Sequence, residues 1–238
     1  MKKLLLSFIA FLSLAVFAQD TKVINDANAT VRNLSGSFNA ISVSSGIDLY
    51  LSPGNEESVA VSASDQKHLD RLKTEVVNGT LKIYYDNKGV TWKSGNSKLK
   101  AYVSFKTLEK LNASAGSQVT VNGSIQAENF KLDVSSGSGF NGTIHAKMLS
   151  TDVSSGASVK ISGKADKLTV DVSSGADFKG YDFVVDYCDA SASSGAAVHV
   201  TINKELNAKA SSGADIRYKG TALIRDIKTS GGGAVKKV

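Results

Sequence analysis

Three aspartates at a constant interval are the residues of this sequence whose type and spacing could carry chemistry. Asp133, Asp152 and Asp171 each precede a glycine by four residues, and 19 residues separate each from the next. If one turn of a repeating structure separates them, their carboxylates lie about 4.8 Å apart on one face. Stacked carboxylates repel one another and raise each other's pKa unless a cation compensates. A calcium site, an acid-base centre and a solvated polar face are therefore the alternatives.

The spacing favours the solvated face over the other two alternatives. Calcium requires about six or more oxygen ligands that converge, whereas side chains on a flat face converge poorly, so we expect no structural metal here. We expect the three carboxylates to stand in water or to contact neighbouring lysines such as Lys131. An acid-base centre would make the protein a carbohydrate-active enzyme, but the sequence offers neither a convincing basic partner nor a ladder of aromatics for sugar rings. We expect no catalytic residues and no cofactor.

The remaining candidates for chemistry are a tryptophan, a cysteine and three histidines. Trp92 lies in the polar, basic stretch 86–100, interpreted as a loop, and is either a ligand-stacking aromatic or a side chain packed on the surface. Together with the three aspartates it makes up the candidate binding face. Cys188 is the only cysteine, so an intrachain disulfide is impossible, and it stands where other repeats have leucine, as a small buried hydrophobe would. The histidines His68, His145 and His199 occupy unrelated repeat positions, which argues against a serine-histidine catalytic pair.

These residues are positioned by a repeat that recurs through the second half of the chain. Its mark is Ser-Ser-Gly or a close variant, and successive glycines are 18 to 21 residues apart. The glycines are Gly116, Gly137, Gly156, Gly175, Gly195, Gly213 and Gly232. An interval of this length is typical of one coil of a β-solenoid, in which each coil buries its apolar face only by stacking on its neighbours. We therefore predict an all-β fold, a single-stranded parallel β-helix with coils of 18 to 21 residues.

Aligned on those glycines, the repeats place apolar residues in columns. Three residues after each glycine stand Val119, Phe140, Val159, Phe178, Val198, Ile216 and Val235. Apolar and polar residues alternate within a repeat, as Leu168, Val170 and Val172 show, which indicates strands with one buried face. The glycine supplies backbone angles that other residues rarely adopt, so Ser-Ser-Gly is interpreted as a corner piece. Phe178 is expected inside the stack, between Val159 and Val198.

Residues 19–111 are predicted to form a less regular N-terminal β portion, continuous with the solenoid of residues 112–238. Ser44-Ser45-Gly46 is an early copy of the corner. Asn78-Gly79 lies between two apolar runs and predicts a β-hairpin with a two-residue turn. Residues 65–71 are expected to form a short helical turn.

The first residues of the chain predict export. Two lysines are followed by an apolar run and then by Ala18, the pattern of a signal peptide over residues 1–18 that is cleaved after Ala18. The sequence contains no second apolar run long enough to span a membrane. The net charge of +6 is too small and too dispersed to indicate nucleic-acid binding. We expect the protein in the periplasm, on the outer-membrane surface or outside the cell.

Ordered motifs along the chain resemble those of one family of exported proteins. They are FNAISVSSGIDLYL at 38–51, LKTEVVNGTLKI at 72–83, LKAYVSFKTLEKLNASAGS at 99–117, and the serial SSGA coils. This order is similar to that of the putative autotransporter adhesin, head GIN domain family, which is common in Bacteroidetes. The resemblance covers about residues 30–238 and implies an exported protein with a β-helical fold. It carries over no catalytic residues.

Three functions are compatible with these observations. The leading one is a non-enzymatic, adhesin-like or cell-envelope scaffold protein whose solenoid faces bind a protein or glycan of the envelope or of a host surface. The second is a carbohydrate-active enzyme centred on the three aspartates. The third is a structural module that forms a homo-oligomer through its terminal coils or a lateral face. We expect neither nucleic-acid binding nor an integral membrane segment.

Overall fold

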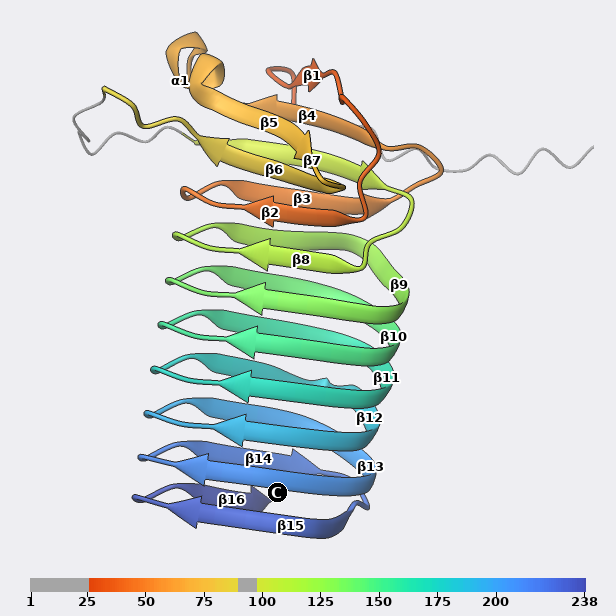
Figure 1. The fold of residues 1–238 in the computed structure, drawn as a ribbon, viewed down its shortest axis with the longest axis vertical. Helices are drawn as coiled ribbons and strands as arrows, with labels where there is room; N and C mark the ends of the chain where they lie inside the picture. The colour runs from red at the N-terminus through yellow and green to blue at the C-terminus, as the bar shows by residue number, and fades with distance from the viewer. Residues whose placement is uncertain (1–25, 90–97) are drawn as a thin grey trace, which may run out of the picture.

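Stacked β-coils make up this protein (Figure 1). The computed structural model describes residues 26–89 and 98–238, and over these ranges the chain is a nearly all-β parallel solenoid of about seven turns. The predicted fold class is thereby confirmed. The expected signal peptide, residues 1–18, and Trp92 both lie outside the described residues.

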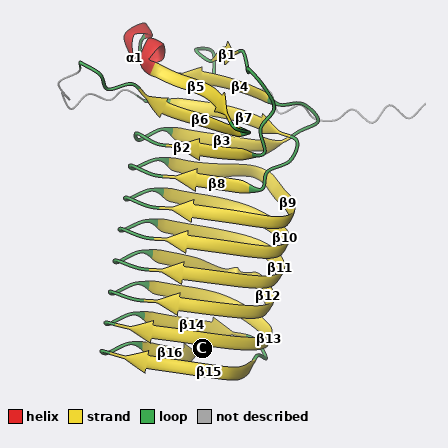
Figure 2. Cartoon of the chain, in the orientation of Figure 1, coloured by secondary structure: helices red, strands yellow, loops and turns green. Residues whose placement is uncertain are grey.

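Each coil of the regular part is one long strand that bends about halfway along its length (Figures 1 and 2). The half that follows a corner glycine lies in one flat face of the solenoid, here called the first face. The half that precedes the next corner glycine lies in the opposite, second face. The long strands are β9 Gln118–Val134, β10 Gly139–Val153, β11 Ser158–Val172, β12 Asp177–Ala192 and β13 Ala197–Ser211. The C-terminal coils continue in parallel register with the shorter strands β14 Asp215–Lys219, β15 Leu223–Ser230 and β16 Ala234–Lys237.

The strand registers confirm the predicted apolar columns. Phe178 pairs with Val159 on one side and with Val198 on the other, and its side chain is fully buried. Cys188 lies in a second buried column, between Leu168 and Leu206. Every coil therefore contributes apolar side chains to one continuous core.

The repeated corner is a tight turn held by backbone hydrogen bonds. At one corner the carbonyl of Ser135 accepts a hydrogen bond of 3.1 Å from the N–H of Ser138, and φ is positive at both central residues, 54° at Ser136 and 69° at Gly137. This is the pattern of a type I′ turn. The N–H of Gly137 donates to the carbonyl of Ser155 on the next coil at 3.0 Å, so the corners themselves form a ladder. The sequence predicted left-handed geometry for the glycine; the second serine adopts it as well, because this turn type requires positive φ at both central positions.

The N-terminal portion contributes coils in an order that differs from the sequence. β2 Ala40–Val43 and β3 Asp48–Pro53 form the coil around the first Ser-Ser-Gly corner. This coil lies between two others, one formed by β6 Thr80–Tyr85 with β7 Lys100–Phe105 and one that begins with β8 Lys110–Ala113. The chain therefore closes an early coil, leaves the stack, and returns on both sides of that coil.

Antiparallel strands cover the N-terminal end of the stack (Figure 1). β4 Ser58–Ser62 pairs with β7, and β1 Thr30–Arg32 pairs with β4. β5 Leu72–Val77 forms the predicted hairpin with β6, through Asn78 and Gly79, which are both at positive φ. These strands end the parallel stack with a cap of different geometry.

Helix α1 Gln66–Arg71 confirms the expected helical turn. Asp65 caps it, because its carboxylate accepts a hydrogen bond of 2.9 Å from the N–H of His68. Of the predicted loop 86–100, the structure describes 86–89 and 98–100, and Lys100 already opens β7. The alternating residues of β7 place Ala101, Val103 and Phe105 in the core.

Candidate functional site

The three aspartates of the predicted binding face lie on consecutive coils. Asp152 pairs with Asp133 in β9 and with Asp171 in β11, and all three belong to an outward column of the second face. Asp152 and Asp171 are exposed, whereas Asp133 is half-buried. Burial, followed by the charges of Asp171 and Asp133, raises the pKa of Asp152 above its usual value. Trp92, the fourth residue of that predicted face, lies outside the described residues.

Lysines accompany this acidic column. The Nζ atoms of Lys110 and Lys131 lie 3.7 Å and 3.6 Å from carboxylate oxygens of Asp133. Within residues 26–89 and 98–238, no three histidine, cysteine or acidic side chains come close enough together to hold a metal ion. On later coils the column continues with Ser191, Lys209 and Lys228. The arrangement is a stripe whose charge changes sign along the solenoid, and the expectation that it does not bind calcium stays a prediction.

Asp152→Asn is expected to stabilise the protein slightly at pH 7. Because the pKa of Asp152 is raised in the folded state, the folded protein holds this proton more tightly than the unfolded chain does, and the ionised carboxylate costs stability. The side chain is exposed, so the gain in the free energy of unfolding is below about 1 kcal/mol. The gain disappears as the pH falls through the raised pKa. Denaturant unfolding of both proteins at pH 7 and at acidic pH measures the difference.

Asp189→Asn is the control for that prediction, because it is expected to change the free energy of unfolding in the opposite direction. The carboxylate of Asp189 accepts hydrogen bonds from Lys167 and from the Asn207 amide, each at 2.8 Å, and these contacts lower its pKa. Its charge therefore stabilises the folded protein at pH 7, and this contribution is lost as the pH falls through the lowered pKa. The control variant is expected to be less stable than the native protein at pH 7. A loss of stability in both variants would contradict the prediction for Asp152.

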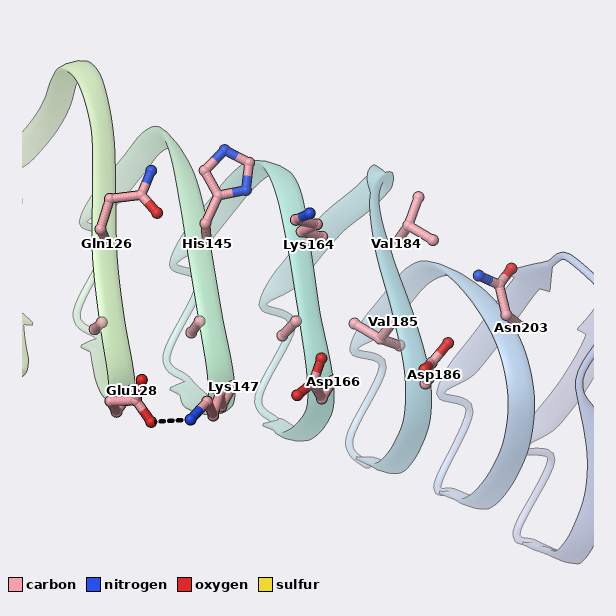
Figure 3. A pocket seen from close by; sticks show the side chains of 13 residues that line it. Gln126, Glu128, His145, Lys147, Lys164, Asp166, Val184, Val185, Asp186 and Asn203 are labelled. Carbon is pink, nitrogen blue, oxygen red and sulfur yellow. Dashed lines mark ion pairs between the residues drawn. The ribbon is translucent and has the colours of Figure 1, made fainter.

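A shallow groove of about 640 Å³ crosses the coils near the bend of the long strands (Figure 3). Its floor is a ladder of small side chains, in which Ala146 pairs with Ala127 and Ala165 on the adjacent coils. Figure 3 shows two rows of larger side chains along this floor. Gln126, His145 and Lys164 lie in one row, and Glu128, Lys147, Asp166 and Asp186 lie in the other. Of these residues, only His145 was considered in the sequence, and none was predicted to belong to a binding face.

Exposed ion pairs line one side of the groove. The Nζ of Lys147 lies 2.6 Å from a carboxylate oxygen of Glu128 (Figure 3). The Nζ of Lys204 lies 2.7 Å from Asp186 and 5.5 Å from the ring centre of Tyr187. Exposed pairs of this kind contribute little to stability. A polar ligand can therefore replace one partner of a pair at small cost.

The shape and polarity of the groove suit the recognition of an extended ligand. Acid-base or nucleophilic catalysis requires unlike groups that hydrogen-bond to one another around a single reacting atom. Here charged groups are distributed along the axis, coil after coil, and several neutralise one another in pairs. A second hollow of about 890 Å³ adjoins the groove, and the exposed Met148 adds apolar surface there, above the buried Leu108 and Phe130.

The sequence does carry a signal for the groove. Three triplets with a central alanine recur at intervals of 19 residues: Gln126-Ala127-Glu128, His145-Ala146-Lys147 and Lys164-Ala165-Asp166. A small residue between two long polar ones, repeated at one position of the coil, leaves a channel between two rows of side chains. The triplets lie about halfway between successive corner glycines, away from the columns that the corners define.

The other residues with reactive side chains lie apart from one another and from the groove floor. Cys188 is buried in the core. His68 contacts the hydroxyl of Tyr85 at 2.7 Å near the N-terminal cap. His199 stacks on Tyr181 on the first face. Cys188, His68 and His199 thus lie in three different parts of the fold, and the expectation that no serine-histidine catalytic pair is formed stays a prediction.

Cys188 is expected to be unreactive in the folded protein. Burial, assisted by the charge of Asp189, raises the pKa of its thiol to about 12, and the thiolate is the form that reacts. Iodoacetamide at mildly alkaline pH should label the native protein very slowly and the denatured chain completely, as measured by intact mass. Rapid labelling of the native protein would show that this part of the core opens readily.

The stacked coils, the capped N-terminal end and the repeated lateral groove define a β-solenoid that presents repeated surfaces. The chain belongs to the family described as "Putative auto-transporter adhesin, head GIN domain", whose model matches residues 37–222. The resemblance noted in the sequence is thereby confirmed. No curated protein matches the chain.

Solved structures from Bacteroidetes share this fold. A putative adhesin from Bacteroides fragilis NCTC 9343 has a TM-score of 0.80 at 15% identity, over 90% of this chain and 98% of that one. A putative adhesin from Parabacteroides distasonis ATCC 8503 has a TM-score of 0.70 at 19% identity, with the same coverage of 90% and 98%. A putative lipid binding protein from the same strain has a TM-score of 0.60 at 19% identity, again over 90% and 98%. At such identities the likeness concerns the fold alone.

Proposed function

We propose that this protein is an exported, non-enzymatic, adhesin-like protein of the cell envelope that binds a protein or glycan of the envelope or of a host surface. The observation that carries the proposal is the groove, in which a small floor and polar walls recur on successive coils. A site that repeats along an axis fits a ligand that is itself extended or repetitive, whereas a catalytic centre gathers unlike groups at one place. The description of the family supports the same role.

Export is part of this proposal, because residues 1–18 have the pattern of a signal peptide. Within the ranges that the structure describes, no helix is long and apolar enough to cross a membrane. We expect the processed protein, beginning at Gln19, in the periplasm, at the outer-membrane surface or outside the cell. Fractionation of the native cells, followed by N-terminal sequencing, tests both the compartment and the cleavage site.

Ala146→Phe tests whether the groove is the binding site. The larger side chain fills the floor between its two polar rows, so the variant should no longer retain the partner that immobilised native protein takes from solubilised cell envelope. Asn141→Phe is the matched control, because Asn141 is exposed, lies on the same strand and does not line the groove. Loss of the partner with Ala146→Phe alone supports the groove. If both variants still retain the partner and their melting temperatures are unchanged, the groove is not the binding site.

Self-association through the C-terminal coil is a second candidate, favoured by a separate observation. Ile224 of β15 pairs with Leu206 of the core column but is 51% exposed, and the adjacent Leu223 is 64% exposed. Among the described strands, β15 pairs only with β13, which leaves its other edge open. An open strand edge with apolar side chains is a template for association. If the β15 edges of two copies paired with each other, the open edges and the exposed apolar side chains would be buried in a symmetric dimer.

Ile224→Lys tests this second candidate. The native protein, from residue 19 onward, should be a dimer by light scattering at micromolar concentration, and the variant a monomer. Val31→Lys is the control, because Val31 is also highly exposed but lies at the opposite end of the solenoid, in β1. A native protein that is monomeric at every concentration, or a control that also dissociates, would contradict association through the C-terminal coil.

A further inference from the structure

The outward column of the first face is basic over the C-terminal coils. Five consecutive coils place a basic residue at the same register position. These residues, here called the basic stripe, are Lys160, Lys179, His199, Arg217 and Lys236. All are exposed except the half-buried His199, whose pKa is lowered chiefly by burial, so that it adds little positive charge at neutral pH. Since neighbouring parallel strands lie about 4.8 Å apart, the stripe is a straight row of basic groups along the solenoid axis.

Acidic neighbours neutralise only part of the stripe. The Nζ of Lys179 lies 3.7 Å from a carboxylate oxygen of Asp177, and the Nε of Arg217 lies 2.7 Å from one of Asp215. At the two ends of the stripe, Lys160 and Lys236 take part in none of the ion pairs formed by the described residues. The ends of the stripe are thus available to an external anion.

An aromatic pair adjoins the middle of the stripe. The ring of Tyr181 stacks on His199 with centroids 4.9 Å apart and an interplanar angle of 23°. The Nζ of Lys219 lies 4.4 Å from the centre of the same tyrosine ring. Lys219 therefore lies over the tyrosine ring, and this cation–π contact holds a further positive charge next to the stripe, where it can meet an acidic substituent of a ligand. The pair joins residues of different coils, so only the fold brings it together.

We infer that the basic stripe binds a linear acidic polysaccharide, which lies along the solenoid axis with its carboxylate or sulfate groups over the lysines and the arginine of the stripe. Charge-assisted hydrogen bonds from lysine and arginine supply the affinity, and the straight row matches an extended polymer. Asp177 and Asp215 lower the potential beside the stripe, which disfavours the dense backbone charge of a nucleic acid. None of the stripe residues lines the groove, so this inference does not rest on the function proposed for the groove.

A pair of double variants with equal charge tests the inference. Lys160→Gln with Lys236→Gln removes the two unpaired ends of the stripe. The control, Lys209→Gln with Lys228→Gln, removes the same charge from an outward column of the second face. The probes are polygalacturonate for carboxylates, dextran sulfate for sulfates, uncharged dextran and a DNA duplex. Their binding to the chain from residue 19 onward is measured by calorimetry at low and high salt.

The native protein should bind at least one of the two acidic polysaccharides, more weakly at high salt, and should not bind dextran. The two acidic probes distinguish carboxylate from sulfate recognition. The stripe variant should lose affinity by about tenfold, about threefold for each of the two exposed lysines removed, while the control changes by less than about twofold. Equal melting temperatures for the three proteins would show that the loss is not caused by unfolding.

Five results would overturn the inference: no binding of either acidic polysaccharide, equal loss in both double variants, loss of polysaccharide binding in Ala146→Phe, equal binding of dextran, or tighter binding of the DNA duplex. The first two assign the stripe no specific role, and the last two assign it a different ligand. Loss of polysaccharide binding in Ala146→Phe would move the site to the groove. Shortening of the polymer during incubation would instead contradict the non-enzymatic function proposed above, while the affinities of the double variants would still decide where the polymer binds.

Discussion

Phe178→Asp is expected to lower the free energy of unfolding by about 4 kcal/mol or more, because it places an unpaired charge in a closed apolar core. The Phe178 side chain is fully buried between Val159 and Val198 of the adjacent coils. Its ring also fills space beside Gly180, where an added Cβ would lie 2.7 Å from the ring. An aspartate at this position can reach neither water nor a cation without opening the coil.

Denaturant unfolding compares this variant with two controls. Lys179→Asp introduces the same side chain one residue along β12, where it points outward, and should change the free energy of unfolding by less than about 1 kcal/mol. Phe178→Leu keeps an apolar side chain at the buried position and should cost about 1 to 3 kcal/mol for the lost volume. If Phe178→Asp were no less stable than Lys179→Asp, the assignment of inward and outward positions in β12 would be wrong.

The columns could be predicted from the sequence because each coil obeys the same local rule. Alternation along a strand separates inward from outward residues, and the glycine of each corner sets a common origin, so Phe178 and Cys188 fall into their columns once the repeats are aligned on their glycines. The Asn78-Gly79 hairpin was predictable for the same reason, since its turn is encoded by two adjacent residues.

The order of the N-terminal coils could not be predicted from the same pattern. β2 pairs with both β6 and β8, although the corner at Gly46 gives no indication that a later segment returns on its far side. Several strands of this chain have similar alternating patterns and could pair with β2. Which of them do so depends on the lengths of the connections and on the antiparallel cap. The stacking of Tyr181 on His199 depends likewise on which coils are neighbours.

Glycines of two kinds became distinguishable only in the structure. The corner glycines, such as Gly175, have positive φ, 68° at this position, and among the described residues no atom lies within 4 Å of an added Cβ. Gly163 lies within the long strand β11, at φ +111°, and an added Cβ there would lie 2.1 Å from the carbonyl oxygen of Ile144. The first position requires a backbone conformation, whereas the second requires both the conformation and the absence of a side chain.

Gly163→Ala is therefore expected to be far more damaging than Gly175→Ala. At Gly175 the alanine fits the available space and costs about 1 kcal/mol for its left-handed conformation. At Gly163 the clash is with the backbone of β10, which pairs with both β9 and β11 and cannot move without loosening two ladders. The expected loss there is about 3 kcal/mol or more.

Urea unfolding of the two alanine variants, measured beside the native protein, decides between these costs. A much lower midpoint for Gly163→Ala than for Gly175→Ala, at similar slope, is the expected result. Equal midpoints would mean that conformation alone accounts for both glycines and that the strands near Gly163 have room for a methyl group. Because Gly163 lies next to Lys164 in the wall of the groove, a destabilised Gly163→Ala should also lose groove binding, whereas Gly175→Ala, at the distant corner, should retain it.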